Sequence, residues 1–201
     1  FKKEIVKSII LSKLGRCNKI FARKCEIKEI DTITARSFFE NNHIQGFVGG
    51  KIKIGMFLDN MLVSAMIIGS NRYNKGFEII RYASKCGTNI IGGFSKFIKY
   101  IKDNITYINE LDSFVELRYF DGHGYLKAGF TKINHTNPSY YYFKSNNIEK
   151  LYHRSVFMKH KLSKSLNVFD ANLTEAQNMR NNGYLKIYDC GTFKMRLAIN
   201  W

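Results

Sequence analysis

The sequence predicts a mixed α+β (α/β) fold in which a mainly antiparallel sheet is flanked by helices. Residues 52–58 alternate apolar and polar side chains and residues 61–68 are almost continuously apolar, which is typical of neighbouring strands. Residues 94–101 repeat apolar side chains at the spacing of one helix face. The chain has 201 residues and is 45% hydrophobic and 14% aromatic, so it can bury a substantial core.

The N-terminal part predicts a helix, a strand and a second helix. Residues 1–24 are rich in lysine and arginine and carry a weak helical stripe, which indicates a basic helix. Residues 24–30 alternate as a first strand. Asp31 or Thr32 is expected to cap a helix that ends near residue 42. Its inward side chains are expected to be Ile33, Phe38 and Phe39.

The remaining elements follow from the same patterns. Asp59-Asn60 is expected to be a hairpin turn, and residues 71–76 a polar turn. We then expect a strand at 77–83, a helix after Gly92-Gly93, a strand at 112–119, a short helix at 125–130 that Gly129 ends, a hairpin of strands 132–135 and 140–144 around Asn137-Pro138, a helix at 173–182 and a closing hairpin of strands 184–188 and 192–199 around Cys190-Gly191.

The predicted organisation is one central domain with an extension at each end. Residues 1–23 form a basic helical extension or linker, residues 24–144 the central domain, and residues 145–201 a basic C-terminal helix-hairpin extension. The chain begins at Phe1, which we interpret as a sign of a fragment or a processed form. An upstream domain is therefore an expected partner.

The charge favours a polyanionic partner. Lys and Arg number 32 against 16 Asp and Glu, which gives a formal net charge of +16 and a positive field around the protein. No apolar run is long enough to span a membrane. Aromatic side chains lie among the basic stretches, so we expect DNA rather than a membrane surface as partner. The alternative is a lysine-rich compositional bias without a binding role. The expected nucleic-acid-binding residues are Lys2, Lys3, Lys7, Arg16, Arg23, Arg81, Arg118, Arg154, Lys159 and Lys161.

The cysteines argue against a structural zinc site and against a disulfide framework. The chain has four cysteines without a C-x-x-C pair, so a structural zinc site and a secreted disulfide framework are both disfavoured. Free thiols suit a reducing cytoplasm, and each thiol is expected to act as a small buried hydrophobic group. The four are Cys17, Cys25, Cys86 and Cys190.

The segment from Asn89 to Lys102 is the strongest candidate for binding a phosphate. Paired glycines that open a helix leave backbone N–H groups free to meet an anion. A close crossing of helix and strand explains the same glycines without any ligand. The candidate phosphate-binding or cofactor-binding residues are Gly92, Gly93, Ser95 and Lys96.

Two motifs carry a resemblance to a known family. They are Asn89-Ile90-Ile91-Gly92-Gly93-Phe94-Ser95-Lys96 and Gly124-Tyr125-Leu126-Lys127-Ala128-Gly129-Phe130. Together with the order of elements over residues 24–144, they resemble the pyrophosphate loop and the late tyrosine and Gly-Phe segment of the GNAT acyltransferases. Asn89 and Phe94 depart from the usual loop, Gln/Arg-x-x-Gly-x-Gly/Ala, and these departures argue against acetyl-CoA as the cofactor.

The whole string also resembles domains at the C-terminal end of phage homing endonucleases, and it is similar to the Mom-type DNA-modification proteins of phages. The resemblance implies that His43, Glu116 and Tyr125 line one cleft and act in adenine modification of DNA. It also implies bound iron, with His43 and Glu116 as ligands, although Mom-type proteins carry Asp where Glu116 stands. The implied setting is the host cytoplasm during infection, behind an upstream nuclease domain.

The chemistry of the three candidates leaves alternatives open. His43 suits a base or a metal ligand, Glu116 a carboxylate whose pKa burial raises, and Tyr125 a donor to developing negative charge. Equally, Glu116 pairs with Arg118 and Tyr125 simply packs. We therefore carry three functions: a DNA-directed transferase, a non-catalytic DNA-binding module of a homing endonuclease, and a small-molecule N-acetyltransferase.

Overall fold

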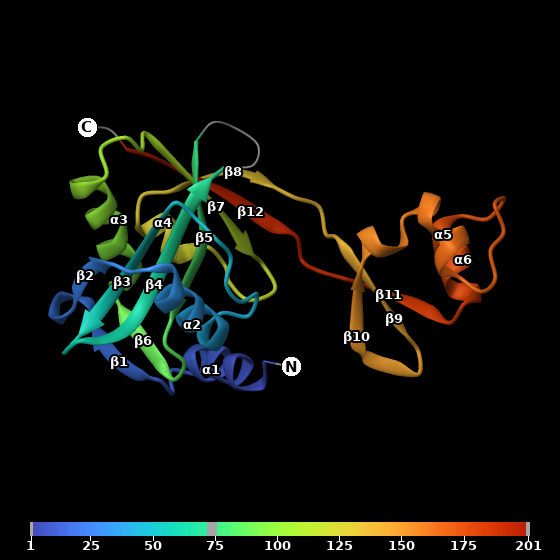
Figure 1. The fold of residues 1–201 in the computed structure, drawn as a ribbon, viewed down its shortest axis with the longest axis horizontal. Coiled ribbons are helices and arrows are strands. Elements are labelled where there is room, and N and C mark those ends of the chain that lie inside the picture. Colours follow the sequence, from blue (N-terminus) through green and yellow to red (C-terminus); the bar gives the residue numbers. More distant parts are fainter. Residues whose placement is uncertain (1, 72–75, 200–201) are drawn as a thin grey trace. The chain divides into compact units, whose positions relative to one another are not determined.

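A computed structural model describes residues 2–71 and 76–199 of the chain, so most of the predicted polar turn at 71–76 lies outside the described residues. The chain divides into two compact units (Figure 1). The first comprises the residues up to 115, residues 121–134 and those from 193 onward, and the second comprises residues 116–120 and 135–192. The boundaries of these units differ from those of the expected segments 1–23, 24–144 and 145–201, because the last strand returns to the sheet of the first unit.

The first unit is built on a seven-stranded sheet with the order β2-β3-β4-β5-β7-β12-β8. The neighbours from β2 to β5 are antiparallel, and β5 and β7 are parallel. This confirms the predicted mixed and mainly antiparallel sheet. The strands are β2 (Glu26–Glu29), β3 (Ile52–Leu58), β4 (Met61–Ser70), β5 (Phe77–Ser84), β7 (Glu110–Glu116), β8 (Thr131–His135) and β12 (Thr192–Ala198).

Helices cover both faces of this sheet, which explains the continuous apolar run of β4. Ala65 and Ile67 pack with Phe39 of α2, whereas Met66 and Ile68 belong to the cluster of Phe97 from α3. A strand that is buried on both faces has no polar face to alternate. The helices of the first unit are α1 (Lys3–Lys13), α2 (Thr32–Asn42), α3 (Gly93–Asn104) and α4 (His123–Lys127).

Helix α2 begins as the sequence predicts. The Asp31 carboxylate accepts a hydrogen bond from the Thr34 backbone N–H at 2.7 Å. Phe38 and Phe39 are buried, but Ile33 is 82% exposed, so its predicted inward orientation is wrong. Ile33 lies in the first turn, on the side of the helix away from Phe38 and Phe39.

A short parallel pair of strands in the first unit was not predicted. Strand β1 (Asn18–Phe21) pairs with β6 (Thr88–Ile91), and the 3-10 turn η1 (Ala22–Lys24) follows β1. The pair joins the N-terminal segment to the residues that lead into α3. Four-residue strands carry too few alternating positions to stand out in a sequence.

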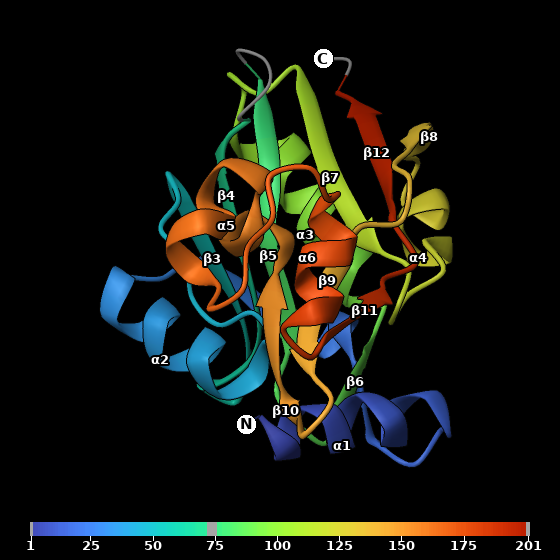
Figure 2. The same cartoon turned by 90° about the vertical axis from the view of Figure 1, so that its right-hand side faces the viewer.

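The second unit is a three-stranded antiparallel sheet with helices on one face (Figure 2). Its core contains Tyr142, Phe157, Leu162 and Met179. Sequence analysis did not predict β10 or α5. The elements are β9 (Tyr140–Lys144), β10 (Asn147–His153), the 3-10 turn η2 (Arg154–Phe157), α5 (Lys159–Ser165), α6 (Glu175–Asn181) and β11 (Tyr184–Tyr188), in the sheet order β10-β9-β11.

Both hairpins predicted in the C-terminal half are wrong. Strands β8 and β9 exist, but they lie in different sheets, and so do β11 and β12. The two connecting segments pair with each other instead of folding back. The Thr136 N–H donates to the Thr192 carbonyl, and the Asp189 N–H donates to the Ser139 carbonyl, each at 2.9 Å. The residues that predicted the two hairpin turns therefore lie in the segments that connect one sheet to the other.

Strand β7 is shorter than predicted. It ends at Glu116 rather than at Tyr119, because the N–H groups of Tyr119 and Phe120 donate to the Glu116 carbonyl in a turn. Apolar alternation alone did not reveal this turn.

Candidate functional site

The parallel strands β5 and β7 pair over a short stretch only. The ladder joins Phe77, Glu78 and Ile79 to Leu111, Asp112 and Ser113. Strand β5 continues to Ser84 and stays paired with β4 on its other side, while β7 continues to Glu116. The backbone of β5 beyond Ile79 therefore has an edge that β7 does not use. Backbone N–H and C=O groups on such an edge are ready to pair with another extended group.

The paired glycines open α3 in the predicted manner. Gly92 has a φ of 76° and is the N-cap, without a side chain that caps the helix. A Cβ at Gly93 would lie 2.9 Å from a methyl carbon of Ile90, so only glycine fits without movement of its neighbours. The first N–H groups of α3 are consequently free of side-chain caps, as an anion-binding helix terminus requires.

Lys96 has protein partners for its ammonium group. Its Nζ donates to the carbonyl oxygens of Ala22, at 3.0 Å, and of Cys25. It thus ties α3 to the N-terminal segment. Ser95 is exposed. The phosphate-binding role of Gly92, Gly93, Ser95 and Lys96 stays a prediction.

Tyr125 of α4 lies in an aromatic cluster of the first unit. Its ring centroid is 4.5 Å from that of Phe94 and 5.3 Å from that of Phe130. Ser113, on β7, donates a hydrogen bond to the Tyr125 hydroxyl at 3.1 Å. Burial raises the pKa of Tyr125 above its ordinary value, so the phenol is protonated at neutral pH.

Phe94 has a structural reason to depart from the family motif. Its ring also meets Tyr82 at 5.2 Å and Phe130 at 5.9 Å, and so fills the space between β5 and α4. Burial raises the pKa of Tyr82 to about 12, so this second phenol is also neutral. Sequence analysis missed Tyr82 and Ser113 as neighbours of this cluster. Their only signal is that each lies on a predicted strand.

His43 follows the last residue of α2 and is neutral at pH 7. Burial lowers its pKa to about 4, and Arg81 and Lys2 add to the effect. The Gln45 backbone N–H donates to Nδ1 at 3.1 Å, which places the ring proton on Nε2. In this tautomer His43 presents a hydrogen-bond donor rather than a lone pair at Nε2.

Glu116 belongs to the second unit and pairs with Arg118, as the non-catalytic alternative expected. Its Oε1 accepts from Arg118 at 2.6 and 3.1 Å. The Arg118 guanidinium also lies 5.6 Å from the centre of the Tyr141 ring. The described partners of His43, Glu116 and Tyr125 have no residue in common, so their shared catalytic role stays a prediction.

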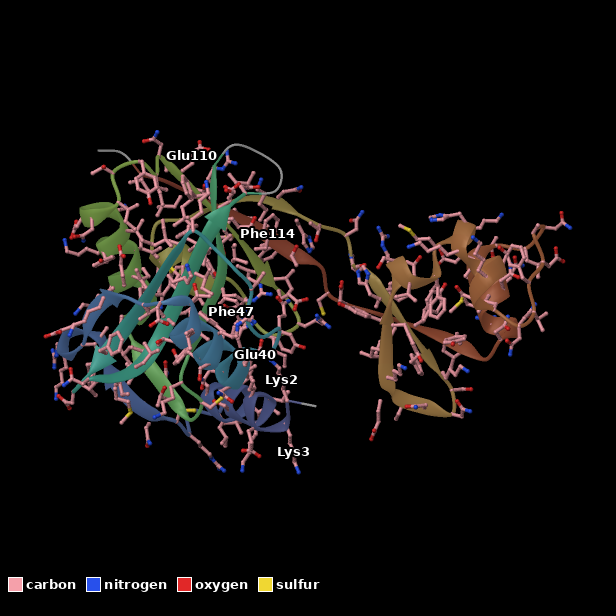
Figure 3. All side chains as sticks on the ribbon, viewed as in Figure 1. Lys2, Lys3, Glu40, Phe47, Glu110 and Phe114 are labelled. Carbon is pink, nitrogen blue, oxygen red and sulfur yellow. The ribbon has the colours of Figure 1, made fainter. Side chains whose placement is uncertain are left out.

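Several predicted nucleic-acid-binding residues have partners within the protein. Lys2 donates to the His43 carbonyl at 3.0 Å and pairs with Glu40 at 3.5 Å, and the Phe47 N–H donates to the same Glu40 carboxylate (Figure 3). Arg81 donates to the carbonyls of Gly46 and Ile80. The remaining predicted residues, apart from Arg118, are exposed: Lys3, Lys7, Arg16, Arg23, Arg154, Lys159 and Lys161.

The described residues contain no group of three or more His, Cys, Asp or Glu side chains that could hold a metal ion. The prediction of bound iron on His43 and Glu116 is therefore wrong for this part of the chain. Among the described helices, none combines the length and the apolar composition that a membrane crossing needs.

Comparisons with solved structures identify the fold. The chain is similar to the ribosomal-protein-S18-alanine N-acetyltransferase from Escherichia coli, at 10% identity and a TM-score of 0.52, over 88% of this chain and 95% of that chain. It is also similar to an acetyltransferase of the GNAT family from Streptococcus pneumoniae, at 12% identity and a TM-score of 0.50, over 88% and 99%. A Bacillus subtilis acetyltransferase in complex with CoA follows at 12% identity and a TM-score of 0.49, over 88% and 99%.

No protein-family model matches the sequence, and a search of curated proteins finds no significant match. The fold is that of the GNAT acetyltransferases, as the resemblance implied.

These comparisons correct two predictions. The Escherichia coli and Streptococcus pneumoniae structures are described as acetyltransferases, and neither description mentions DNA modification. The prediction of a Mom-type, DNA-directed transferase or a DNA-binding module of a homing endonuclease is therefore wrong. The prediction against acetyl-CoA is wrong for the same reason. It gave too much weight to Asn89 and Phe94, although the free helix terminus remains.

Proposed function

We propose that this protein is an N-acetyltransferase that transfers an acetyl group from acetyl-CoA to an amine. One observation carries the proposal: the ladder between β5 and β7 stops at Ile79 and Ser113 in a chain with the GNAT fold. The same unit holds an uncapped helix terminus and a protonated, partly buried tyrosine. Each of these features suits a different part of the cofactor.

The residues present fit CoA at two places. The first N–H groups of α3, at Gly93 and Ser95, suit the pyrophosphate, because a helix N-terminus favours negative charge. The edge of β5 beyond Ile79, with which β7 does not pair, suits the amide groups of the pantetheine arm, which can pair with a strand edge. Gly93 itself is required by the packing of α3 against Ile90, because a Cβ there has no room.

Tyr125 is our proposed proton donor. Bound acetyl-CoA would supply the acetyl group as a thioester. The amine nitrogen would form a C–N bond as the C–S bond breaks, the amine would lose one proton to solvent, and the departing sulfur would need one proton from a donor. Ser113 donates to the Tyr125 oxygen, which leaves the phenol proton available, and the raised pKa keeps that proton in place until it is needed.

His43 and Glu116 keep their catalytic roles only as part of this proposal. The Nε2–H of His43 suits a hydrogen bond to an acceptor oxygen, and the low pKa keeps the ring neutral. Glu116 would act as a base only after release from Arg118.

Four expectations from the sequence also remain proposals. They are kinship with phage domains, a setting in the host cytoplasm, an upstream nuclease domain, and DNA as a partner. The exposed cations, including Lys3, Lys7 and Arg16, support the partner, and its binding should weaken steeply with salt.

The test uses the full chain with acetyl-CoA and a panel of lysine peptides, polyamines and simple amines. We expect CoA binding by calorimetry and amine-dependent release of the CoA thiol. Tyr125→Phe should keep CoA binding and lower kcat by about 100-fold, the scale of general acid catalysis. Tyr107→Phe is the matched control, because Tyr107 is 62% exposed and packs on Phe77. Absence of CoA binding to the wild-type chain would refute the proposal.

A further inference from the structure

Two cysteines of the first unit, Cys17 and Cys86, lie outside its hydrophobic core. Both thiols are free and partly exposed, whereas Cys25 is 3% exposed and belongs to the core cluster. The expected role of a small buried hydrophobic group therefore fits Cys25 but not the other two. Partly exposed thiols are open to exchange with disulfides from solution.

Backbone hydrogen bonds bring these two cysteine positions together. The N–H of Asn18 donates to the carbonyl of Gly87 at 2.9 Å. Each of these two residues directly follows one of the cysteines in the chain. Strands β1 and β6 begin here and run parallel, so both cysteines lie at the same end of the pair. Adjacent strands lie about 4.8 Å apart, which is within the Cα separation that a disulfide spans.

Ser8 of α1 contacts both cysteine positions, because α1 lies beside β6 (Figure 1). The Cys17 thiol donates to the Ser8 carbonyl at 3.9 Å, and the Gly87 N–H donates to the Ser8 hydroxyl at 2.9 Å. Burial raises the pKa of Cys86, while a hydrogen bond with the Ser8 side chain opposes the rise. The nearby Glu4 carboxylate and Cys17 thiol also raise this pKa. The two thiols therefore share one serine and lie within electrostatic reach of each other.

The turn that carries Cys86 is held in place by α2. The Cys86 N–H donates to the Asn42 side chain at 2.7 Å, and the Cys86 thiol donates to the Asn41 carbonyl at 3.6 Å. A thiol is a weak hydrogen-bond donor, so little free energy is lost when this sulfur turns from the carbonyl toward Cys17. A bond between the two sulfurs therefore requires rotation of side chains on a backbone that is already fixed.

We propose that Cys17 and Cys86 form a reversible disulfide by exchange with a small-molecule disulfide such as oxidised glutathione, and that this bond ties α1 and β1 to β6. One cysteine loses its proton to solvent, and its thiolate attacks the glutathione disulfide to form a mixed disulfide. The second cysteine also loses its proton, and its sulfur displaces the remaining glutathione. Each released glutathione thiolate takes up one proton, so two cysteine thiols are oxidised and one disulfide is reduced. The proposal does not depend on acetyl transfer and is tested separately from it.

The test treats the full chain with oxidised glutathione, alkylates the free thiols and maps the tryptic peptides by mass spectrometry without reduction. Trypsin cleaves after Arg16 and after Lys85, so the disulfide should join the peptide of residues 17–19 to that of residues 86–96. Because the bond closes a long loop and restricts the unfolded chain, oxidation should raise the midpoint of thermal unfolding by about 5–10 °C. Dithiothreitol should reverse both changes.

Cys17→Ser keeps the shape of the side chain and should abolish both the joined peptide and the rise of the midpoint. Cys190→Ser is the matched control, because Cys190 is exposed in the second unit, and it should leave both unchanged. The peptide map of the wild-type chain needs no variant, so the proposal stays testable if Cys17→Ser does not fold. Alkylation of Cys17 and Cys86 after oxidation, glutathione on each without a bond between them, a disulfide between two copies of the chain, or an unchanged midpoint would overturn the proposal.

Discussion

The two units of this protein hold their polar groups in different ways. The first has a mainly aliphatic core with one aromatic cluster, and in its described part the one buried carboxylate is Asp112, which is 2% exposed and held by Arg196 and Lys194. The second has a core rich in tyrosine, in which Tyr140 and Tyr142 both donate to a single oxygen of Glu175. The first unit therefore depends on a buried charge pair, and the second on neutral donors that share one acceptor.

This difference follows from the topology. Strand β12 returns from the second unit to the first and lies next to β7, and Arg196 of β12 holds Asp112 of β7 through both carboxylate oxygens, at 2.7 and 3.0 Å. Asn71 donates to the same carboxylate at 2.7 Å. The network fixes the register of a strand that enters its sheet from a distant part of the chain. Fixing such a register is a known use of buried polar groups.

The largest effect should come from breaking this network. Burial opposes ionisation of Asp112, but the hydrogen bonds from Arg196 and Lys194 outweigh it and hold its pKa below the usual value. Asp112→Ala leaves both cations without this partner, so we expect a loss of about 3–5 kcal/mol in the free energy of unfolding. Urea denaturation followed by circular dichroism measures it.

Glu110→Gln is the control for this prediction. Glu110 also pairs with Arg196, at 3.1 Å, but its side chain is 51% exposed. An exposed pair contributes little, so the change should stay within about 1 kcal/mol. Equal losses of unfolding free energy in the two variants would show that burial of Asp112 adds nothing to its contribution to stability.

The next largest effect concerns pH and the first unit alone. The unfolded chain protonates His43 near pH 6.5, whereas in the folded protein burial, Arg81 and Lys2 lower its pKa to about 4. Between these values the unfolded state binds more protons, so stability falls as the pH falls from 6.5 to 4. The contribution of His43 is about 3 kcal/mol at most.

The measurement compares the free energy of unfolding at several pH values in the wild type, in His43→Gln and in His123→Gln. Removing His43 should flatten the slope between pH 6.5 and 4. His123→Gln is an exposed substitution of the same kind beside Asp121, and it controls for the loss of an imidazole as such. A steep slope that persists without His43 would assign the pH dependence to other groups.

The fold of the first unit could be predicted because its signals are local. The alternation of residues 52–58, the turn at Asp59-Asn60, where both φ angles are positive, and the period of residues 94–101 each fix one element. The pairing of β8 with β12 could not be predicted, because it joins residues about 60 positions apart. Turn residues such as Asn137-Pro138 show where a strand ends but not which sheet receives the next one.

The candidate site shows the same limit. Gly92, Gly93 and Tyr125 were found because glycine turns and helix periods are visible in one segment. Ser113 was missed, because its contact with Tyr125 depends on the packing of α4 against β7. The partner of Glu116 was foreseen only as an alternative, since residues two apart on a strand share a face but need not touch.

A smaller effect should separate the second unit from the first. Burial and the hydrogen bond to Glu175 both raise the pKa of Tyr142, so its proton stays on the hydroxyl. Glu175→Ala removes the acceptor of two tyrosine hydroxyls, which should cost about 2 kcal/mol. Hydrogen exchange should speed up in peptides of β9 and β11 but not in β3 or β4. Glu149→Ala, an exposed change in β10 of the same sheet, should leave exchange in both units unchanged.

The smallest effect comes from the helix caps and tests whether each unit opens independently. Thr174 and Gln177 form a capping box at the start of α6, in which the Gln177 N–H donates to the Thr174 hydroxyl at 3.3 Å and the Thr174 N–H donates to the Gln177 side chain at 2.9 Å. Thr174→Ala should cost about 1 kcal/mol. Asp31→Ala removes the corresponding cap of α2 in the first unit.

Hydrogen exchange distinguishes the two variants by location. Exchange should speed up in α6 for Thr174→Ala and in α2 for Asp31→Ala, because local opening spreads only through residues that unfold together. The paired segments around Thr136 and Thr192 are the route by which opening of one unit could reach the other. If either substitution speeds exchange in both units, these segments transmit the loss, and the two units form one cooperative structure despite their different cores.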